Sequence, residues 1–227
     1  MMQSVLLIGA NRGLGLGLAR DYLRRGWRVT ATTRDPGKAE ALDALGRESG
    51  GTLRVEQADI TDRVSMERLA AAVAGQAFDL LFIVAGRSGS SAAPVHEVSP
   101  ESASLEFLTN SYGPPVAAER LLGVLRPKAP VVFMTSVLGS LSRSSGGMEI
   151  YSASKAALNM LGIAFARRHP ERPVILMHPG WVKTDMGGAN APLDVETSAR
   201  GMVDAIAARE GAAGVAYIDY KGEAIGW

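Results

Sequence analysis

Short apolar runs alternate with longer helical stretches along this chain, and this alternation constrains the fold more than any other feature. The first run covers residues 5–8, and it precedes a helical stretch over residues 14–25 that Gly26 ends. Apolar runs this short and this continuous are typical of strands that are buried on both faces of a sheet. Strands that alternate with helices predict a parallel sheet, whose right-handed crossovers place helices on both of its faces.

The same pattern continues to the end of the chain. The predicted strands cover residues 5–8, 28–32, 52–57, 80–84, 131–134, 174–177 and 215–218. The predicted helices cover residues 14–25, 36–47, 63–74, about 100–125, 151–168 and 196–209. No long linker separates these segments. We therefore predict an α/β fold with a single domain over residues 1–227, built on a doubly wound parallel sheet of about seven strands.

Composition excludes several other classes of protein. The chain is 47% hydrophobic and 21% charged, which is unlike a disordered protein. Its formal net charge of +1 gives no strong field to attract nucleic acid or an anionic membrane. No apolar run approaches the ~20 residues that span a bilayer, and the start lacks the basic region of a signal peptide. The chain has no cysteine, and its 3 histidines lack metal-ligand spacing. We expect a cytoplasmic protein without metal, nucleic-acid or membrane partners.

A glycine-rich turn follows the first predicted strand. Gly9, Gly13 and Gly15 have the spacing GxxxGxG. Glycine permits a sharp turn and a close approach of the backbone to a pyrophosphate, and the next helix points free N–H groups at the phosphates. Gly15 and Gly17 would also let this helix sit close to a neighbouring strand. A flexible turn without a ligand is the alternative, but the position at the first strand-to-helix turn favours dinucleotide binding.

The end of the second predicted strand distinguishes NADP(H) from NAD(H). A carboxylate at this position binds the ribose 2′-hydroxyl of NAD, whereas an arginine accommodates the 2′-phosphate of NADP. Here the last strand positions carry no carboxylate and Arg34 follows directly, with Arg12 as a second candidate cation. We therefore favour NADP(H) over NAD(H). In the alternative, Arg34 is a solvated charge and Asp35 turns inward to the ribose.

The residues after the third predicted strand allow two interpretations. The Asp59 carboxylate could accept a hydrogen bond from the adenine amino group, with the Ile60 backbone beside it. A helix N-cap role for Asp59 or Thr61 is the alternative.

Tyr151 and Lys155 are four residues apart at the start of a predicted helix, so they lie on one helix face. A cation about 4 Å away could lower the pKa of a tyrosine, about 10 when free, by up to about 3. The phenol would then serve as a general acid or base. An exposed helix pair is the alternative for these two residues alone. Ser136 adds weight because it ends the fifth predicted strand, at the sheet edge where ligands bind.

Asn110 lies inside the long predicted helix, four residues before Pro114. Proline has no N–H, so Pro114 cannot bond the carbonyl of Asn110, and Pro115 cannot bond that of Ser111. A kink and a free carbonyl suited to an ordered water are expected. In the alternative, a helix begins at Pro114 and Asn110 lies in the preceding turn.

Taken jointly, these motifs resemble the short-chain dehydrogenase/reductase family over nearly the whole chain. The resemblance is greatest to the compact C-factor-like carbonyl reductases, and it implies a Rossmann fold. The matching segments are residues 9–15, Asp59 with Ile60, Ala85 with Gly86, Asn110, Ser136, Tyr151 with Lys155, and residues 178–184, which read HPGWVKT.

The resemblance implies a role for each catalytic candidate. Tyr151 would be the acid/base, and Lys155 would lower its pKa and bond the nicotinamide ribose. Ser136 would hydrogen-bond the substrate oxygen. Asn110 would hold a water that links Lys155 to solvent. Together with the turn and the strand ends, the resemblance predicts these cofactor-binding residues: Gly9, Asn11, Arg12, Gly13, Leu14, Arg34, Asp59, Ile60, Ala85, Gly86, Tyr151, Lys155, Pro179, Gly180, Val182 and Thr184.

One departure from the family pattern leaves two functions open. Relatives usually carry two asparagines where this chain has Ile83 and Val84, so the side-chain amides that would brace the sheet are replaced by apolar groups. The first function is an NADP(H)-dependent oxidoreductase that interconverts a small-molecule carbonyl and an alcohol. The alternative is a dinucleotide-binding regulatory or signalling protein with weak or no turnover.

Family members often pair through the helices at Asn110 and Tyr151, which implies a homodimer or homotetramer.

Overall fold

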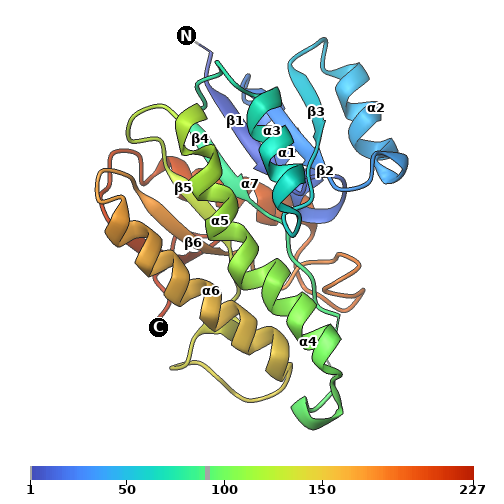
Figure 1. The fold of residues 1–227 in the computed structure, drawn as a ribbon, viewed down its shortest axis with the longest axis vertical. Coiled ribbons are helices and arrows are strands. Elements are labelled where there is room, and N and C mark those ends of the chain that lie inside the picture. Colours follow the sequence, from blue (N-terminus) through green and yellow to red (C-terminus); the bar gives the residue numbers. More distant parts are fainter. Residues whose placement is uncertain (1, 90–92) are drawn as a thin grey trace.

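The computed structural model describes residues 2–89 and 93–227, and it contains one parallel sheet with helices on both faces (Figure 1). The strands are β1 Ser4–Ile8, β2 Arg28–Thr33, β3 Leu53–Gln57, β4 Leu80–Ile83, β5 Val131–Met134, β6 Val174–His178 and β7 Val215–Asp219. The strand order is β3-β2-β1-β4-β5-β6-β7, and every pair is parallel. The doubly wound α/β fold predicted from the sequence is therefore confirmed.

The central strands β4 and β5 are fully apolar because helices cover the sheet on both sides. The helices are α1 Gly13–Arg24, α2 Glu40–Glu48, α3 Arg63–Ala72, α4 Pro100–Phe107, α5 Gly113–Leu121, α6 Glu149–Arg168 and α7 Val195–Ala207. In β1, Leu6 and Ile8 join a core with α3, α5 and α6, whereas Val5 and Leu7 join a second core with α1, α2 and α7. Full burial of one such side chain contributes about 1.5–3 kcal/mol.

Most predicted elements match the observed ones to within one or two residues, but two details differ. The helix predicted over residues 36–47 is divided into a 3₁₀ turn, η1 Pro36–Lys38, and α2. Gly17 permits close packing, but a Cβ there would meet Val195 of α7 rather than a neighbouring strand. The side of α1 that carries Gly17 therefore packs against the helix α7.

The long helical region after β4 is continuous and contains a π-helical turn. It runs through α4, the π-helix η3 Leu108–Tyr112, α5 and a final 3₁₀ turn, η4 Leu122–Val124. The N–H of Gly113 bonds the carbonyl of Leu108, five residues back. The expected interruption is therefore present, and the alternative of a helix that begins at Pro114 is wrong.

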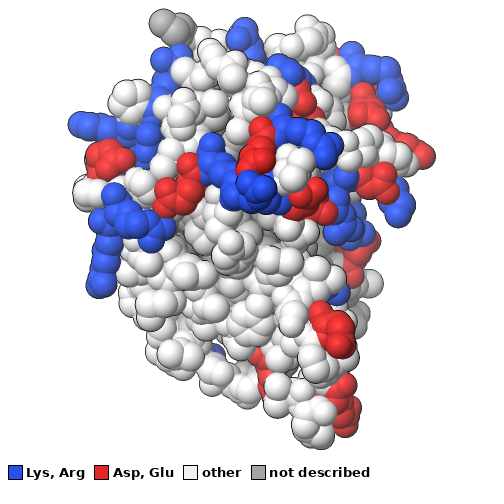
Figure 2. All heavy atoms as spheres, in the orientation of Figure 1, with Lys and Arg blue, Asp and Glu red and all other residues white. Residues whose placement is uncertain are grey.

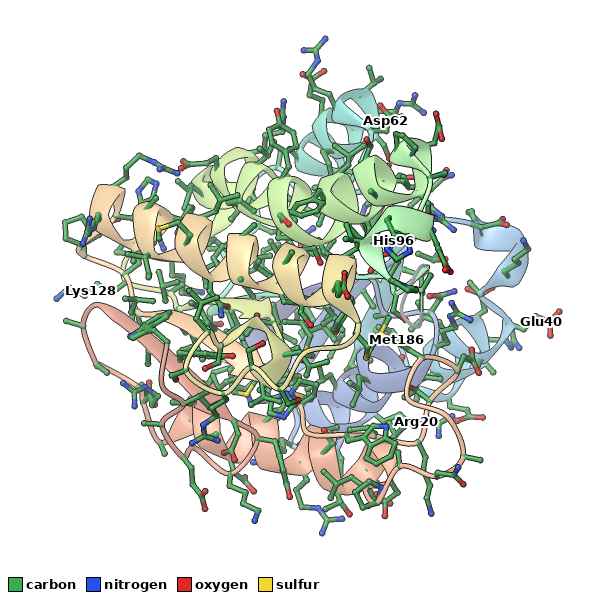
Figure 3. All side chains as sticks on the ribbon, turned by 90° about the horizontal axis from the view of Figure 1, so that it is seen from below. Arg20, Glu40, Asp62, His96, Lys128 and Met186 are labelled. Atoms are coloured by element: carbon green, nitrogen blue, oxygen red, sulfur yellow. The ribbon has the colours of Figure 1, made fainter. Side chains whose placement is uncertain are left out.

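All strands point their carboxyl ends the same way, so the loops that follow them gather at one end of the molecule. In Figure 3 this end lies towards the right, where His96 and Met186 mark the loops after β4 and β6. The strand order reverses between β1 and β4, and such a switch point opens a crevice for ligands in α/β sheets. Within the described residues, no helix combines the length and apolar character that crossing a membrane requires.

Candidate active site

The glycine turn between β1 and α1 has the geometry of an anion cradle. Gly9 and Gly13 have positive φ angles of 89° and 53°, which glycine adopts without strain. A Cβ at Gly15 would collide with the carbonyl oxygen of Gly9. The N-cap residue Arg12 makes no side-chain capping bond, and the first turn of α1 carries no acidic residue. The free N–H groups and positive end of α1 are thus available to an anion, which fits a dinucleotide pyrophosphate.

Cationic side chains lie near this turn. Arg34 is exposed directly after β2, and its guanidinium makes no ion pair with any described residue. Arg12 forms an exposed ion pair of 2.6 Å with Asp185 of the loop after β6. Asp35 does not turn inward: its carboxylate accepts the N–H of Gly37 at 3.0 Å and pairs with Lys38 at 3.5 Å. The arrangement leaves a positive charge, and no inward carboxylate, at the end of β2.

Asp59 forms a local turn rather than a helix cap. Its Oδ1 accepts hydrogen bonds from the N–H of Thr61 at 2.8 Å and from the Thr61 hydroxyl at 2.7 Å. The N-cap of α3 is Asp62, whose side chain accepts the N–H of Val64. The N-cap alternative for Asp59 and Thr61 is therefore wrong.

The segment after β4 is held by backbone bonds and apolar packing where relatives use asparagines. Ile83 is 1% exposed in the core, and the N–H groups of Val84 and Ala85 both bond the carbonyl of Ile8. A Cβ on Gly9 would lie 2.9 Å from Ala85, so this segment closely approaches the glycine turn. Gly86 lies next to Lys155, because a Cβ there would be 3.4 Å from Nζ.

Tyr151, Ser136 and Lys155 converge above the carboxyl end of β5. Tyr151 is buried in the first turns of α6, and the Ser136 side chain lies close enough to act on its phenol. The Lys155 ammonium lies 5.7 Å from the centroid of the Tyr151 ring and donates to the carbonyl of Met134 at 2.9 Å. A Cβ on Gly139 would lie 2.7 Å from the Lys155 carbonyl carbon, so Gly139 lets this loop approach α6 closely.

Burial dominates the protonation of this pair. It raises the pKa of Tyr151 to about 12, against a lowering contribution from the Ser136 side chain. It also lowers the pKa of Lys155 to about 8. Lys155 is not among the groups that lower the pKa of Tyr151 here, which differs from the sequence expectation. The phenol is consequently protonated at neutral pH and suited to donate a proton.

Asn110 is completely buried in the π-helix and anchors the loop after β4. Its Oδ1 accepts the N–H of Arg87, and its Nδ2 donates to the carbonyl of Arg87, each at 2.8 Å. Nδ2 also donates to the Ser154 hydroxyl at 3.0 Å. The residues four and five positions after Asn110 are Pro114 and Pro115, so neither an α-type nor a π-type bond can reach its carbonyl.

The segment after β6 is fixed by tight contacts. The Ser198 hydroxyl donates to the carbonyl of Pro179 at 2.6 Å. Gly180 has a φ of 83°, and a Cβ there would meet Leu193. Val182 is 4% exposed, and Thr184 lies near Gly13 of the cofactor turn. The segments after β1, β4 and β6 therefore lie close together at the carboxyl end of the sheet.

Sequence reasoning missed two residues of this site. Tyr217 of β7 donates its hydroxyl to the carbonyl of Ser136 at 2.6 Å and so fixes the residue that contacts Tyr151. Glu106 of α4 is 0% exposed, and its charge acts on both Tyr151 and Lys155. The spacing of four between Glu106 and Asn110 is a signal that could have placed Glu106 on the inner face of the helix.

Comparisons with known proteins agree with this geometry. The family model described as short chain dehydrogenase matches residues 3–192. A putative short-chain dehydrogenase/reductase from Burkholderia multivorans, solved with bound NADP, is 36% identical with a TM-score of 0.96. A carbonyl reductase from Pseudomonas aeruginosa PAO1, solved in complex with NADP, is 36% identical with a TM-score of 0.93. Both matches cover 100% of each chain. The C-signal protein of Myxococcus xanthus is 39% identical over 126 residues, covering 53% of this chain and 76% of that protein.

Proposed function

Because this chain belongs to the short-chain dehydrogenase/reductase family, we propose that it reduces a small-molecule carbonyl to an alcohol with NADP(H), and catalyses the reverse. The observation that carries this proposal is the buried Tyr151, which lies beside Ser136 and the Lys155 ammonium at the carboxyl end of the sheet. A phenol in that environment retains its proton until a substrate oxygen develops negative charge.

The residues of the site divide the chemistry among them. When bound, the nicotinamide would supply the hydride that adds to the carbonyl carbon. Tyr151 donates its proton to the carbonyl oxygen, which becomes the alcohol hydroxyl, and Ser136 orients that oxygen with a hydrogen bond. Lys155 then returns a proton to the resulting phenolate. The Asn110 carbonyl, which neither an α-type nor a π-type helical bond can reach, is suited to hold a water that returns a proton to Lys155.

We propose that the cofactor is NADP(H) rather than NAD(H). Arg34 is exposed and free of ion pairs within the described chain, and Arg12 lies in the adjoining turn. Arginine matches the geometry of a phosphate group. Asp35, the carboxylate that would favour NAD(H), is engaged with Gly37 and Lys38. We also propose that the cofactor-binding residues predicted from the sequence, from Gly9 to Thr184, contact NADP(H).

The rim of the site favours a substrate with an apolar group next to its carbonyl. Leu141 of the loop after β5 is 81% exposed, and Trp181 and Met186 of the loop after β6 are 58% and 49% exposed. The Trp181 indole donates to the carbonyl of Gly187, which holds the ring in place. Aromatic and aliphatic aldehydes, ketones and quinones are therefore the first substrates to test.

We also propose that residues 1–227 form one domain that pairs into a homodimer through α5 and α6. Figure 2 shows few charged side chains over the part of this face that α6 occupies. Met160 of α6 is 65% exposed, and Tyr112, which directly precedes α5, is 59% exposed. Exposed apolar patches of this kind are typical of protein–protein contacts.

A regulatory protein with weak or no turnover is the second candidate. The replacement of the usual asparagines by Ile83 and Val84 favours it, because the sheet is braced there by apolar packing instead of side-chain amides.

Consumption of NADPH against the carbonyl panel distinguishes the two candidates. The enzyme predicts saturable turnover of at least one carbonyl, with NADH less effective. Tight NADPH binding without turnover of any panel member would instead support the regulatory candidate and contradict the enzymatic one.

A further inference from the structure

A carboxylate is buried one helical turn before Asn110. Glu106 belongs to the last turn of α4 and is 0% exposed. The loss of hydration makes a buried carboxylate costly unless hydrogen bonds and an opposite charge offset it. Since α4 packs against α6, which carries the buried Lys155, the interior of the site supplies such a charge.

Glu106 and Asn110 hold the same loop from the same helical region. The Glu106 Oε2 accepts the N–H of Gly89 at 3.1 Å, two residues beyond the Arg87 backbone that Asn110 binds. A Cβ on Gly86 would lie 3.4 Å from both the Asn110 Oδ1 and the Lys155 Nζ. The loop after β4 is therefore fixed directly against the lysine ammonium.

The charge of Glu106 reaches both groups of the catalytic pair. It raises the pKa of Lys155 against the lowering effect of burial, and it also raises the pKa of Tyr151. The other titratable group that acts on Tyr151 is Tyr217, from β7. Among the described residues, Glu106 thus supplies the one carboxylate that acts on both groups.

We propose that Glu106 is a positioning residue of this active site: its buried carboxylate holds the loop after β4 in place and keeps the Lys155 ammonium charged. The proposal rests on the catalytic roles of Tyr151 and Lys155 given above. In this role Glu106 acts through the lysine and through the backbone of residues 87–89, whose Gly89 N–H it accepts.

The isosteric change Glu106→Gln tests the charge separately from the loop contact. The amide oxygen can still accept the N–H of Gly89, but the negative charge is lost. The pKa of Lys155 and that of Tyr151 should both fall, because the charge of Glu106 raises both. We expect the alkaline limb of the pH profile of kcat for carbonyl reduction to move to lower pH by about one unit.

A second variant tests the loop contact. Glu106→Asp retains the charge but shortens the side chain, so its pH profile should match that of the unmodified protein while KM for NADPH rises severalfold. Glu101→Gln is the matched control, because Glu101 lies exposed on the same helix. A Glu106→Gln profile that coincides with that of Glu101→Gln, in a protein that melts cooperatively, would overturn the proposal.

Direct titration of Lys155 keeps this test independent of turnover. Its ε-carbon can be followed by NMR in lysine-labelled protein and assigned with Lys155→Met. We expect the pKa of Lys155 to fall by about one in Glu106→Gln and to stay near its original value in Glu106→Asp. An unmoved lysine pKa in Glu106→Gln would refute the role of the charge, whether or not the protein reduces any carbonyl. An absence of turnover in the unmodified protein would count only against the proposed enzyme.

Discussion

Replacement of Arg34 by alanine should separate the two cofactors. Arg34 lies at the end of β2, exposed and without an ion pair among the described residues, so its donors are available to a 2′-phosphate. Charge-assisted hydrogen bonds to phosphate contribute about 1.5–3 kcal/mol, and exposure to solvent favours the lower half of that range. A loss of about 1.5–2 kcal/mol corresponds to a 10- to 30-fold rise in Kd for NADPH.

NADH lacks the 2′-phosphate, so its Kd should change less than about twofold in the same variant. Both constants are measured by calorimetric titration at one fixed ionic strength, because salt screens exposed charges. Arg28→Ala is the matched control, since Arg28 is exposed at the opposite end of the same strand. Equal losses for NADPH and NADH in Arg34→Ala, or equal losses in the two variants, would refute the assignment of Arg34 to the phosphate.

Three further predictions concern stability, each measured as the free energy of unfolding in urea. Gly15→Ala should cost more than about 2 kcal/mol because its Cβ would collide with the carbonyl of Gly9, whereas Gly123→Ala, with no atom within 4 Å, should cost little. Lys155→Met should remove most of the gain in stability, about 2 kcal/mol, that the unmodified protein shows as the pH rises from 8 to 10.5. Burial lowers the pKa of this lysine to about 8, so the unfolded chain holds the proton over a pH range in which the folded protein has already lost it. Burial lowers the pKa of His178 to about 4, so the unfolded chain binds a proton before the folded protein does as the pH falls. The free energy of unfolding should therefore decrease by about 2 kcal/mol between pH 6.5 and pH 4. His178→Gln should remove most of this decrease. A gain for Gly15→Ala, an unchanged rise in stability above pH 8 for Lys155→Met, or an unchanged acid response for His178→Gln would contradict the corresponding reasoning.

The sheet could be predicted because its strands are buried on both faces. The run over residues 131–134 contains only apolar side chains and forms β5 with the same bounds. Boundaries were less predictable where local hydrogen bonds compete with the helix. Asp35 accepts the N–H of Gly37 and begins a 3₁₀ turn, so α2 starts later than the helical pattern indicated.

The gathering of Ser136, Tyr151 and Lys155 could also be predicted, since strand ends and helix starts meet at one edge of a parallel sheet. The place of Asn110 in this group followed from the family resemblance. The contributions of Glu106 and Tyr217 could not be predicted. Both come from elements distant in sequence, and a glutamate in a helix is ordinarily solvated. Their burial depends on how α4 packs against α6 and how β7 joins the sheet, which no local pattern specifies.

The same limit applies to the protonation of Tyr151. The spacing of four residues correctly placed Lys155 near the phenol, at 5.7 Å from the ring centroid. The spacing alone does not indicate how deeply the two side chains are buried. That burial raises the pKa of Tyr151 and lowers the pKa of Lys155. Burial, rather than the spacing of the pair, therefore sets the protonation of the site.

The turnover of Tyr151→Phe tests the central claim most directly. Phenylalanine preserves the ring that packs in the site and removes only the hydroxyl that lies beside Ser136. With the best carbonyl substrate and saturating NADPH, we predict that kcat falls by about 10²- to 10⁴-fold while Kd for NADPH stays within about twofold. A kcat equal to that of the unmodified protein would show that Tyr151 is not the proton donor and would contradict the account.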